Sequence, residues 1–412
     1  MNGRRLFIMV LVVIVGMVSY GGFALADDDP QLSDMEELGK SIFFDENLSF
    51  NENESCASCH GPEAGWTGPE SAINAAGAAY EGSIAGRFGN RKPPSAAYAT
   101  LSPILHMDKK GTFTGGNFWD GRATGEKLGN PAADQAQGPF LNPLEQALGA
   151  PADVVTGVCE GSYGDLFKQV WGADICDPAN VDMAYDEIAL SIAAYEASPE
   201  VNAFTSKFDY TKQGMAKLTK EEQKGFALFQ GKGKCRLCHT SNGQDPLFTD
   251  FTYDNLGVPK NPENPFYGEL TFNPLGGDWV DLGLGGFLET RTDYESFAED
   301  QLGTVKVPTL RNVDLRPDSG FVKAYMHNGY FKTLEGVVHF YNTRDVLDEC
   351  PTDGVYGDLG YTAEEAMAAN CWPAPEVAEN VNYDELGDLG LTAEEEADIV
   401  AFLKTLSDGY QP

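Results

Sequence analysis

A helical period of apolar residues marks two segments of the chain. Residues 185–195 and 392–406 place apolar side chains at i, i+3 and i+4 spacing, so we expect an amphipathic helix in each. A capping box, in which Ser or Thr is followed three residues later by Glu, satisfies free backbone N–H groups at a helix start. Three such boxes are Ser33 with Glu36, Thr219 with Glu222, and Thr392 with Glu395. These patterns predict a mostly α-helical protein.

A longer apolar run lies near the N-terminus. Two arginines precede the run from Leu6 to Val18, and Ala24-Leu25-Ala26 follows it before a group of acidic residues. A basic start, an apolar run and a small-x-small site form the layout of a secretory signal. We therefore predict a signal peptide over residues 1–26 and a periplasmic protein. Because the uncharged stretch continues to Ala26, an uncleaved N-terminal anchor is the alternative.

Two copies of the pattern C-x-x-C-H carry the candidate chemistry: Cys56, Cys59 and His60, then Cys235, Cys238 and His239. Two thiols at this spacing attach the vinyl groups of one haem c, while the adjacent His ligates its iron. A thioredoxin-like dithiol does not require the His, and a zinc site would use both pairs together. Two complete copies in an exported chain predict two covalently bound haem c groups.

Similar segments precede the two motifs. Gly39 and Phe43 in the first half, and Gly225 and Phe229 in the second, stand at the same offset after a capping box. A helix before the haem motif and another long after it is the order of a small cytochrome c domain. We predict a pseudo-repeat of two cytochrome c-like haem domains with long loops, a peroxidatic one over residues 27–205 and an electron-transfer one over 206–412. The Gly-, Pro- and Asn-rich stretch 259–286 is expected to be a loop.

The other four cysteines, Cys159, Cys176, Cys350 and Cys371, lie apart from the haem motifs in loop-like stretches. In an oxidising compartment, nearness in sequence makes Cys159–Cys176 and Cys350–Cys371 the expected disulfides. Buried free thiols are the alternative. If these cysteines form disulfides, they cross-link the chain and take no part in catalysis.

The composition is that of an ordinary globular protein with a large excess of acids. The 412 residues are 42% hydrophobic and 22% charged, and 28 Lys and Arg against 63 Asp and Glu give a net charge of -35. A nucleic-acid-binding protein needs cations facing the phosphates, so nucleic acid is excluded as a partner. The charge favours basic partners instead.

The second axial position of each haem iron decides between electron transfer and chemistry at the metal. Outside the two motifs the sequence offers His106, His327 and His339. A lone His is more often structural than a ligand, so we expect one iron to be open. An open ferric haem beside an acid–base group can bind and split hydrogen peroxide.

Five further motifs extend along both halves of the chain: FWDGRA (118–123), QAQGP (135–139), VPTLRN (307–312), AYMHNG (324–329) and TLEGVV (333–338). Together with the haem motifs they resemble the bacterial di-haem cytochrome c peroxidases and their relative MauG, which uses peroxide to oxidise residues of a partner protein. The resemblance covers nearly the whole chain after residue 26. It implies a peroxidase with hydrogen peroxide as its oxidant.

The resemblance also assigns roles to single residues. It makes His60 the proximal ligand of the peroxide-reacting haem, and Gln135 and Glu145 the pair in the distal pocket. Glu145 would move a proton from the near to the far peroxide oxygen, as heterolysis requires. Trp119 would lie between the two haems as an electron relay. On the residues alone, Glu145 would be a solvated acid and Trp119 a core aromatic.

Two departures from the family's typical peroxidases point toward the MauG branch. Those enzymes carry a His after the first haem motif that blocks the iron until the other haem is reduced, but no His lies between His60 and His106. Tyr341 stands where the second haem's distal Met is expected. A hard, anionic phenolate favours ferric and higher oxidation states. His339 and Met326 are the alternative ligands.

A calcium site implied by the resemblance is doubtful. Lys92 stands where the family has an Asn ligand, and an ammonium cannot ligate calcium, which takes oxygen donors. Asn90 or water would have to substitute.

Three functions are compatible with the sequence. The main hypothesis is a peroxidase that reduces hydrogen peroxide with electrons from a small cytochrome c or a cupredoxin. The second is MauG-like oxidation of Trp or Tyr residues in a specific partner protein. The third is a plain di-haem electron carrier, in which Gln135 and Glu145 would be surface residues. A homodimer is compatible with all three.

Overall fold

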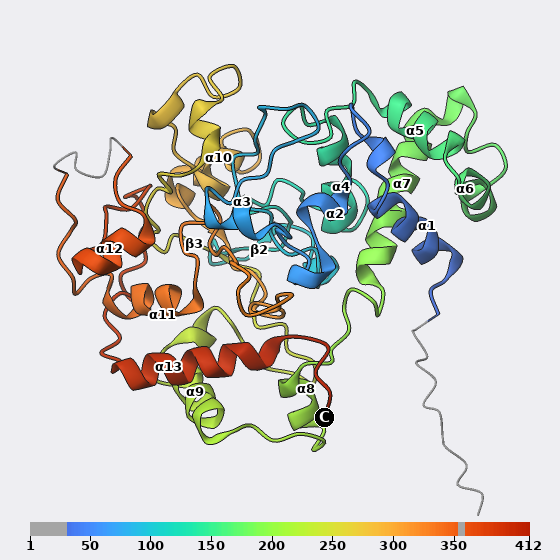
Figure 1. Ribbon diagram of the computed structural model, residues 1–412. Helices are drawn as coiled ribbons and strands as arrows, with labels where there is room; N and C mark the ends of the chain where they lie inside the picture. Colours follow the sequence, from blue (N-terminus) through green and yellow to red (C-terminus); the bar gives the residue numbers. More distant parts are fainter. Residues whose placement is uncertain (1–30, 353–358) are drawn as a thin grey trace, which may run out of the picture. The chain divides into compact units, whose positions relative to one another are not determined.

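Helices and loops dominate the computed structural model (Figure 1), which describes residues 31–352 and 359–412. The predicted signal peptide, residues 1–26, lies outside the described residues. The helices are α1 (Asp34–Phe43), α2 (Cys56–Cys59), α3 (Ser71–Ala75), α4 (Pro131–Leu141), α5 (Pro151–Glu160), α6 (Gly164–Trp171), α7 (Val181–Ala197), α8 (Lys207–Lys212), α9 (Lys220–Gln230), α10 (Gly283–Leu288), α11 (Leu334–Thr343), α12 (Ala363–Ala369) and α13 (Ala393–Leu403). The strands form two antiparallel pairs, β1 (His106–Met107) with β2 (Phe113–Thr114) and β3 (Tyr253–Asp254) with β4 (Val305–Lys306).

The helix starts agree with the capping pattern of the sequence. All three capping boxes form both reciprocal hydrogen bonds, so α1, α9 and α13 begin where predicted. The expected helix over 185–195 lies inside the longer α7. The helix expected up to residue 406 ends as α-helix at Leu403 and continues as a 3-10 turn. The stretch 259–286 is mostly irregular, as expected, and contains only two short 3-10 turns and the start of α10 at Gly283.

Two helix pairs have the same construction. α1 packs against α7, and α9 packs against α13 (Figure 1). A Cβ atom on Gly39 would lie 1.9 Å from the backbone oxygen of Ser191, and one on Gly225 would lie 1.8 Å from that of Asp398. Only glycine allows two backbones to approach this closely. The equal offset of the two glycines in the sequence therefore reflects the same kind of helix crossing in each half.

The variant Gly225→Ala is expected to destabilise the protein. Its methyl group would overlap the backbone of Asp398 and force α9 and α13 apart, and such overpacking costs about 1–3 kcal/mol or more. Chemical denaturation of the purified protein measures the loss. Gly268→Ala is the matched control, because no atom lies within 4 Å of a Cβ at that position. Equal stabilities of the two variants would contradict the close helix crossing.

Two large hydrophobic clusters divide the core. Every buried member of the first lies between Leu32 and Val201, and every buried member of the second lies between Phe208 and Leu406. The first cluster ends at Val201 and the second begins at Phe208, so the predicted domain boundary at residue 205 lies between them. Backbone contacts nevertheless group residues 32–412 into one compact unit. The division into two domains at residue 205 therefore stays a prediction.

Both expected disulfides are present, Cys159 with Cys176 and Cys350 with Cys371. Cys159 lies in the last turn of α5 and not in a loop as expected. The four cysteines of the haem motifs are free. Over the described ranges, none of the helices is both long enough and apolar enough to cross a membrane.

Candidate haem cavities and active site

Each C-x-x-C-H motif lines a cavity of its own. The first cavity contains Cys56, Cys59 and His60 in its wall and encloses about 1570 Å³, part of it open to solvent. The second contains Cys235, Cys238 and His239 and encloses about 1590 Å³ on the same measure. Each motif therefore has a cavity beside it in which a bound group can lie.

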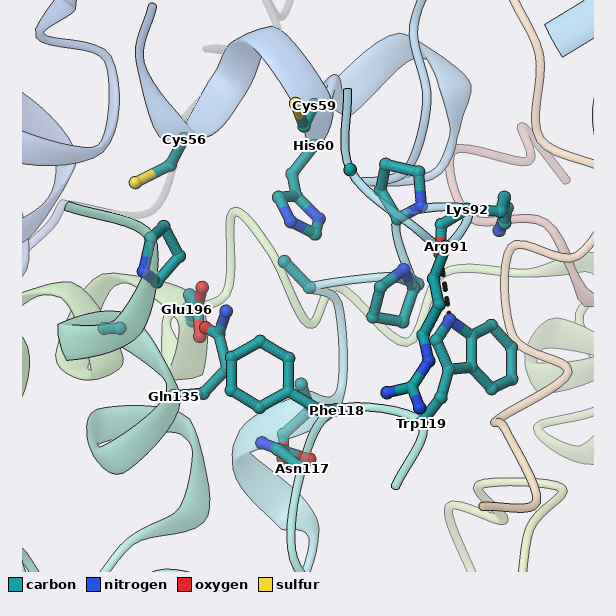
Figure 2. A pocket seen from close by; sticks show the side chains of 18 of the residues that line it. Cys56, Cys59, His60, Arg91, Lys92, Asn117, Phe118, Trp119, Gln135 and Glu196 are labelled. Carbon is teal, nitrogen blue, oxygen red and sulfur yellow. Dashed lines mark hydrogen bonds between the residues drawn. The ribbon is translucent and has the colours of Figure 1, made fainter. Parts of the chain in front are cut away.

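Backbone carbonyl groups orient the two histidines. Nδ1 of His60 lies 3.3 Å from the carbonyl oxygen of Trp66, and Nδ1 of His239 lies 2.8 Å from that of Phe248. Burial lowers the pKa of both imidazoles, that of His60 to about 4. A neutral ring that donates through Nδ1 keeps a lone pair on Nε2, which is the usual state of a metal-ligating His. The ring of His60 points into the first cavity (Figure 2). The neutral imidazoles and the free thiols beside each cavity fit haem c at both places.

Gln135 and Glu145 both line the first cavity, and neither is exposed. Gln135 belongs to α4 and faces His60 across the cavity (Figure 2), and Glu145 lies in the turn that follows α4. Burial raises the pKa of Glu145, against the opposing effects of the Arg122 charge and a hydrogen bond with Asn142. The surface positions expected for a plain electron carrier are wrong for both residues.

Trp119 lies in a wall that the two cavities share, because it lines both of them. Its side chain is 7% exposed. The indole Nε1–H donates to the carbonyl oxygen of Lys92 at 2.9 Å, drawn as a dashed line in Figure 2. The backbone N–H of Lys306 donates to the carbonyl oxygen of Trp119, also at 2.9 Å. An oxidisable indole is thus held between the two candidate haem cavities.

Tyr341 lines the second cavity from α11. Of the two alternative ligands, Met326 also lines this cavity, whereas His339 does not. The ring of His339 lies against Glu396, with Nδ1 3.1 Å from Oε1. His106 lines neither cavity and is exposed. His327 lines the second cavity as well, and its Nε2 lies 3.4 Å from Oε2 of Glu376. Tyr341, Met326 and His327 are therefore the candidates named from the sequence that line this cavity.

Two carboxyl groups of the first cavity were missed in the sequence. Glu196, on α7, is 5% exposed and lies beside Gln135 (Figure 2), and burial raises its pKa to about 8. Glu54 is 6% exposed, and burial together with the nearby Glu145 charge raises its pKa to about 7. One signal was available: Glu196 follows the buried Ile192 by four residues, so an acid occupies the apolar face of a helix.

Phe118 adds a strained aromatic wall to the first cavity. Its backbone φ of 60° is in the left-handed region, which bulky residues rarely adopt. Such strain concentrates at functional sites. The Arg122 guanidinium lies 3.7 Å from the centre of the Phe118 ring and covers one face of it. The strain therefore places a rigid apolar side chain next to Gln135 (Figure 2).

The calcium prediction gains no support from the side chains. Lys92 is 9% exposed and lines both cavities, so an ammonium group occupies the position of the expected oxygen ligand. In residues 31–352 and 359–412, the one group of His, Cys, Asp or Glu side chains close enough to share a metal ion is Cys238, Asp254 and Glu385. That group includes a thiol of the second haem motif. Calcium binding stays a doubtful prediction.

Comparisons with known proteins agree on one family. The family model for di-haem cytochrome c peroxidase matches residues 33–217. The methylamine utilization protein MauG of Paracoccus denitrificans is 35% identical over 382 residues, 91% of this chain and 89% of that protein. Cytochrome c551 peroxidase of Nitrosomonas europaea is 30% identical over 310 residues, 75% of this chain and 73% of that protein. The crystal structure of the diheme peroxidase BthA from Burkholderia thailandensis has a TM-score of 0.70 at 28% identity, with 91% of this chain and 86% of that chain covered.

A mostly helical chain with two such cavities has the construction of a di-haem oxidoreductase. The chain belongs to the di-haem cytochrome c peroxidase family, as the motifs in its sequence predict. It is therefore an enzyme of the peroxidase class and not a plain electron carrier.

Proposed function

We propose that the protein reduces hydrogen peroxide in the periplasm with electrons from a small cytochrome c or a cupredoxin. The observation that carries this proposal is the pair Gln135 and Glu145, which line the same cavity as His60. Trp119, in the wall shared with a second cavity, supports it. The negative chain suits a donor with a basic surface.

We infer that each cavity holds one haem c through its own motif. Cys56 and Cys59 would form the thioether bonds of the first haem, and Cys235 and Cys238 those of the second. His60 and His239 would ligate iron through Nε2, and Tyr341 would be the second ligand in its cavity. A haem bound in the first cavity supplies an iron centre at which peroxide can be reduced.

Glu145 supplies the proton movement that peroxide reduction needs. Hydrogen peroxide takes up two electrons and two protons to give two waters, and an oxygen leaves as water only if it is protonated. The Glu145 carboxyl accepts a proton from one peroxide oxygen and returns it to the other. Its raised pKa favours this exchange, because the group then gains and loses a proton more readily near neutral pH. The Gln135 amide donates a hydrogen bond that orients the peroxide.

The walls of the first cavity complete the site. The rigid Phe118 ring excludes water next to Gln135, and Trp119 offers an indole through which electrons can pass from the second cavity. The electrons that arrive from the donor replace those that peroxide takes. The donor supplies the two electrons and solvent supplies the two protons, so that each hydrogen peroxide gives two waters.

A second candidate function is the oxidation of Trp or Tyr residues in a partner protein. The position of Tyr341 in the second cavity favours it, because a phenolate ligand would help that haem share an oxidising equivalent. His106, the next histidine after the first haem motif, lies outside both cavities. No described histidine besides His60 lines the first cavity to block an open iron there.

The ferric protein is expected to react with one equivalent of hydrogen peroxide before any reductant is added. Absorption spectra recorded before and after the addition measure the reaction, and a pyridine haemochrome assay counts the haems. A mixed high-spin and low-spin spectrum that changes at once supports the proposal. Two low-spin haems that do not react with peroxide, in both the ferric and the half-reduced protein, would overturn it.

A second experiment separates the two candidate functions. It compares turnover with a cytochrome or cupredoxin as the electron donor with oxidation of Trp or Tyr residues in a partner protein.

A further inference from the structure

Two lysines flank Trp119 in the wall between the cavities. Both Lys92 and Lys306 line the first cavity as well as the second. Their backbones hold Trp119 from two sides, Lys92 through its carbonyl oxygen and Lys306 through its N–H. The same wall therefore carries two ammonium groups and one indole.

Neither ammonium group has a carboxylate partner among the residues that the structure describes. Nζ of Lys306 donates to the amide oxygen Oδ1 of Asn117 at 2.7 Å and lies 5.4 Å from the centre of the Phe251 ring. Lys92 is 9% exposed. The adjacent Arg91, in contrast, pairs with Asp120 at 2.7 Å and with Asp281 at 2.5 Å. Burial lowers the pKa of both lysines to about 7.

A buried charge is costly unless it is paired or fully hydrogen-bonded. Lys323, a third buried lysine beside the second cavity, meets this requirement. Its Nζ donates to the carbonyl oxygens of Ala64, Asn312 and Leu315, at 2.7, 2.8 and 2.8 Å. Among the residues that the structure describes, Lys92 and Lys306 have no such set of acceptors. Because both side chains line the cavities, an anionic group held there can supply the acceptors that they lack.

We propose that Lys92 and Lys306 bind the propionate carboxylates of the haems at the wall that contains Trp119. The inference rests on the proposed function, because it requires a haem in each cavity. Propionates are the anionic substituents of haem, and a carboxylate is the acceptor that an unpaired ammonium needs. Because both lysines line both cavities, each can be reached from either side. They act as positioning residues that fix the haem carboxylates and keep positive charge beside Trp119.

Removal of one ammonium group is expected to lower a haem reduction potential. An unpaired carboxylate stabilises ferric over ferrous iron, since the ferric state carries the larger positive charge. In Lys92→Met we expect the ferric-to-ferrous ratio at a fixed potential to rise at least tenfold for one haem. For a one-electron couple this equals about 59 mV. Lys306→Met should shift a midpoint in the same direction, and Lys92→Arg, which keeps the charge, should retain the wild-type midpoints.

A potentiometric titration followed by haem absorbance measures these midpoints without turnover. Lys110→Met is the matched control, because it removes the same charge from an exposed turn, where solvent and salt screen it. Resonance Raman spectra give a second readout, since the propionate bending band should move in Lys92→Met and Lys306→Met but not in the control.

The proposal would be overturned if the haem midpoint potentials in Lys92→Met and Lys306→Met shift no more than in Lys110→Met and the propionate band does not move. If Lys92→Met does not fold, the midpoint potentials and the propionate band of Lys306→Met alone test the proposal. The haem content of the wild-type protein distinguishes this failure from that of the proposed function. Two attached haems with unshifted midpoints in the variants overturn the lysine inference alone, whereas a wild-type protein without haem overturns both.

Discussion

Glu145→Gln should slow peroxide reduction by about 10²–10⁴-fold, which is the usual contribution of a positioned acid–base group. The amide has nearly the shape of the carboxyl, so the first cavity and the haem motifs should be unchanged. It cannot accept a proton from one peroxide oxygen and return it to the other. Stopped-flow spectra after one equivalent of peroxide, together with steady-state turnover, measure the loss, and a haemochrome assay checks that both haems remain attached.

The neighbouring carboxyl groups make this experiment specific. Glu160→Gln is the control, because it makes the same substitution at an exposed position at the end of α5. Glu54→Gln and Glu196→Gln test the two buried carboxyl groups of the same cavity. A wild-type rate in Glu145→Gln, with the large loss in one of the other two variants, would move the proton-transfer role to that residue.

The helical framework could be predicted because its signals are local. Capping boxes fix where α1, α9 and α13 begin, since the side chain and the backbone groups that it satisfies lie within one turn. Nearness in sequence was enough for both disulfides. Gly39 and Gly225 stood out by their equal offset, but the sequence could not show that each meets the backbone of a helix more than 150 residues away.

The walls of the cavities were harder to predict because they depend on distant segments. The wall around Trp119 combines Lys92 from a loop with Lys306 from β4. No local sequence pattern predicts that the backbones of both lysines form hydrogen bonds with Trp119. The folded chain was likewise needed to show which of His106, His327, His339 and Met326 line a cavity, and of these His327 and Met326 line the second one. His339 precedes Tyr341 by two residues on one helix, so the two side chains point to different sides of α11, and only Tyr341 lines the cavity. The resemblance identified Gln135 and Glu145 as candidates, and the fold places both in the same cavity.

Under the proposed function, the shared wall would couple the two haem cavities through Trp119. The indole N–H and the backbone carbonyl oxygen of Trp119 are both hydrogen-bonded, so the buried indole has little freedom to move relative to either cavity. The two lysines beside it would disfavour a positive charge on the indole unless anions balance them. Binding of the haem carboxylates by these lysines would therefore also make Trp119 easier to oxidise.

Tyr341→Met is expected to raise the reduction potential of the second haem by on the order of 100 mV or more, since axial ligands spread haem potentials over about 0.8 V. A soft thioether favours ferrous iron, whereas a hard anionic phenolate favours the ferric state. Potentiometric titration of the variant and the wild-type protein measures the difference, with haem content as the check on assembly.

Met326→Leu is the matched variant for this ligand test, because Met326 lines the same cavity and carries a possible sulfur ligand. If Tyr341 is the ligand, Met326→Leu should leave the potential close to that of the wild type. An unchanged potential in Tyr341→Met, together with a fall in Met326→Leu, would assign the ligand to Met326. The second haem would then be an electron entry port, because a thioether ligand suits a centre that accepts electrons from a donor. That outcome would remove the main support for the oxidation of a partner protein and leave the donor-fed peroxidase.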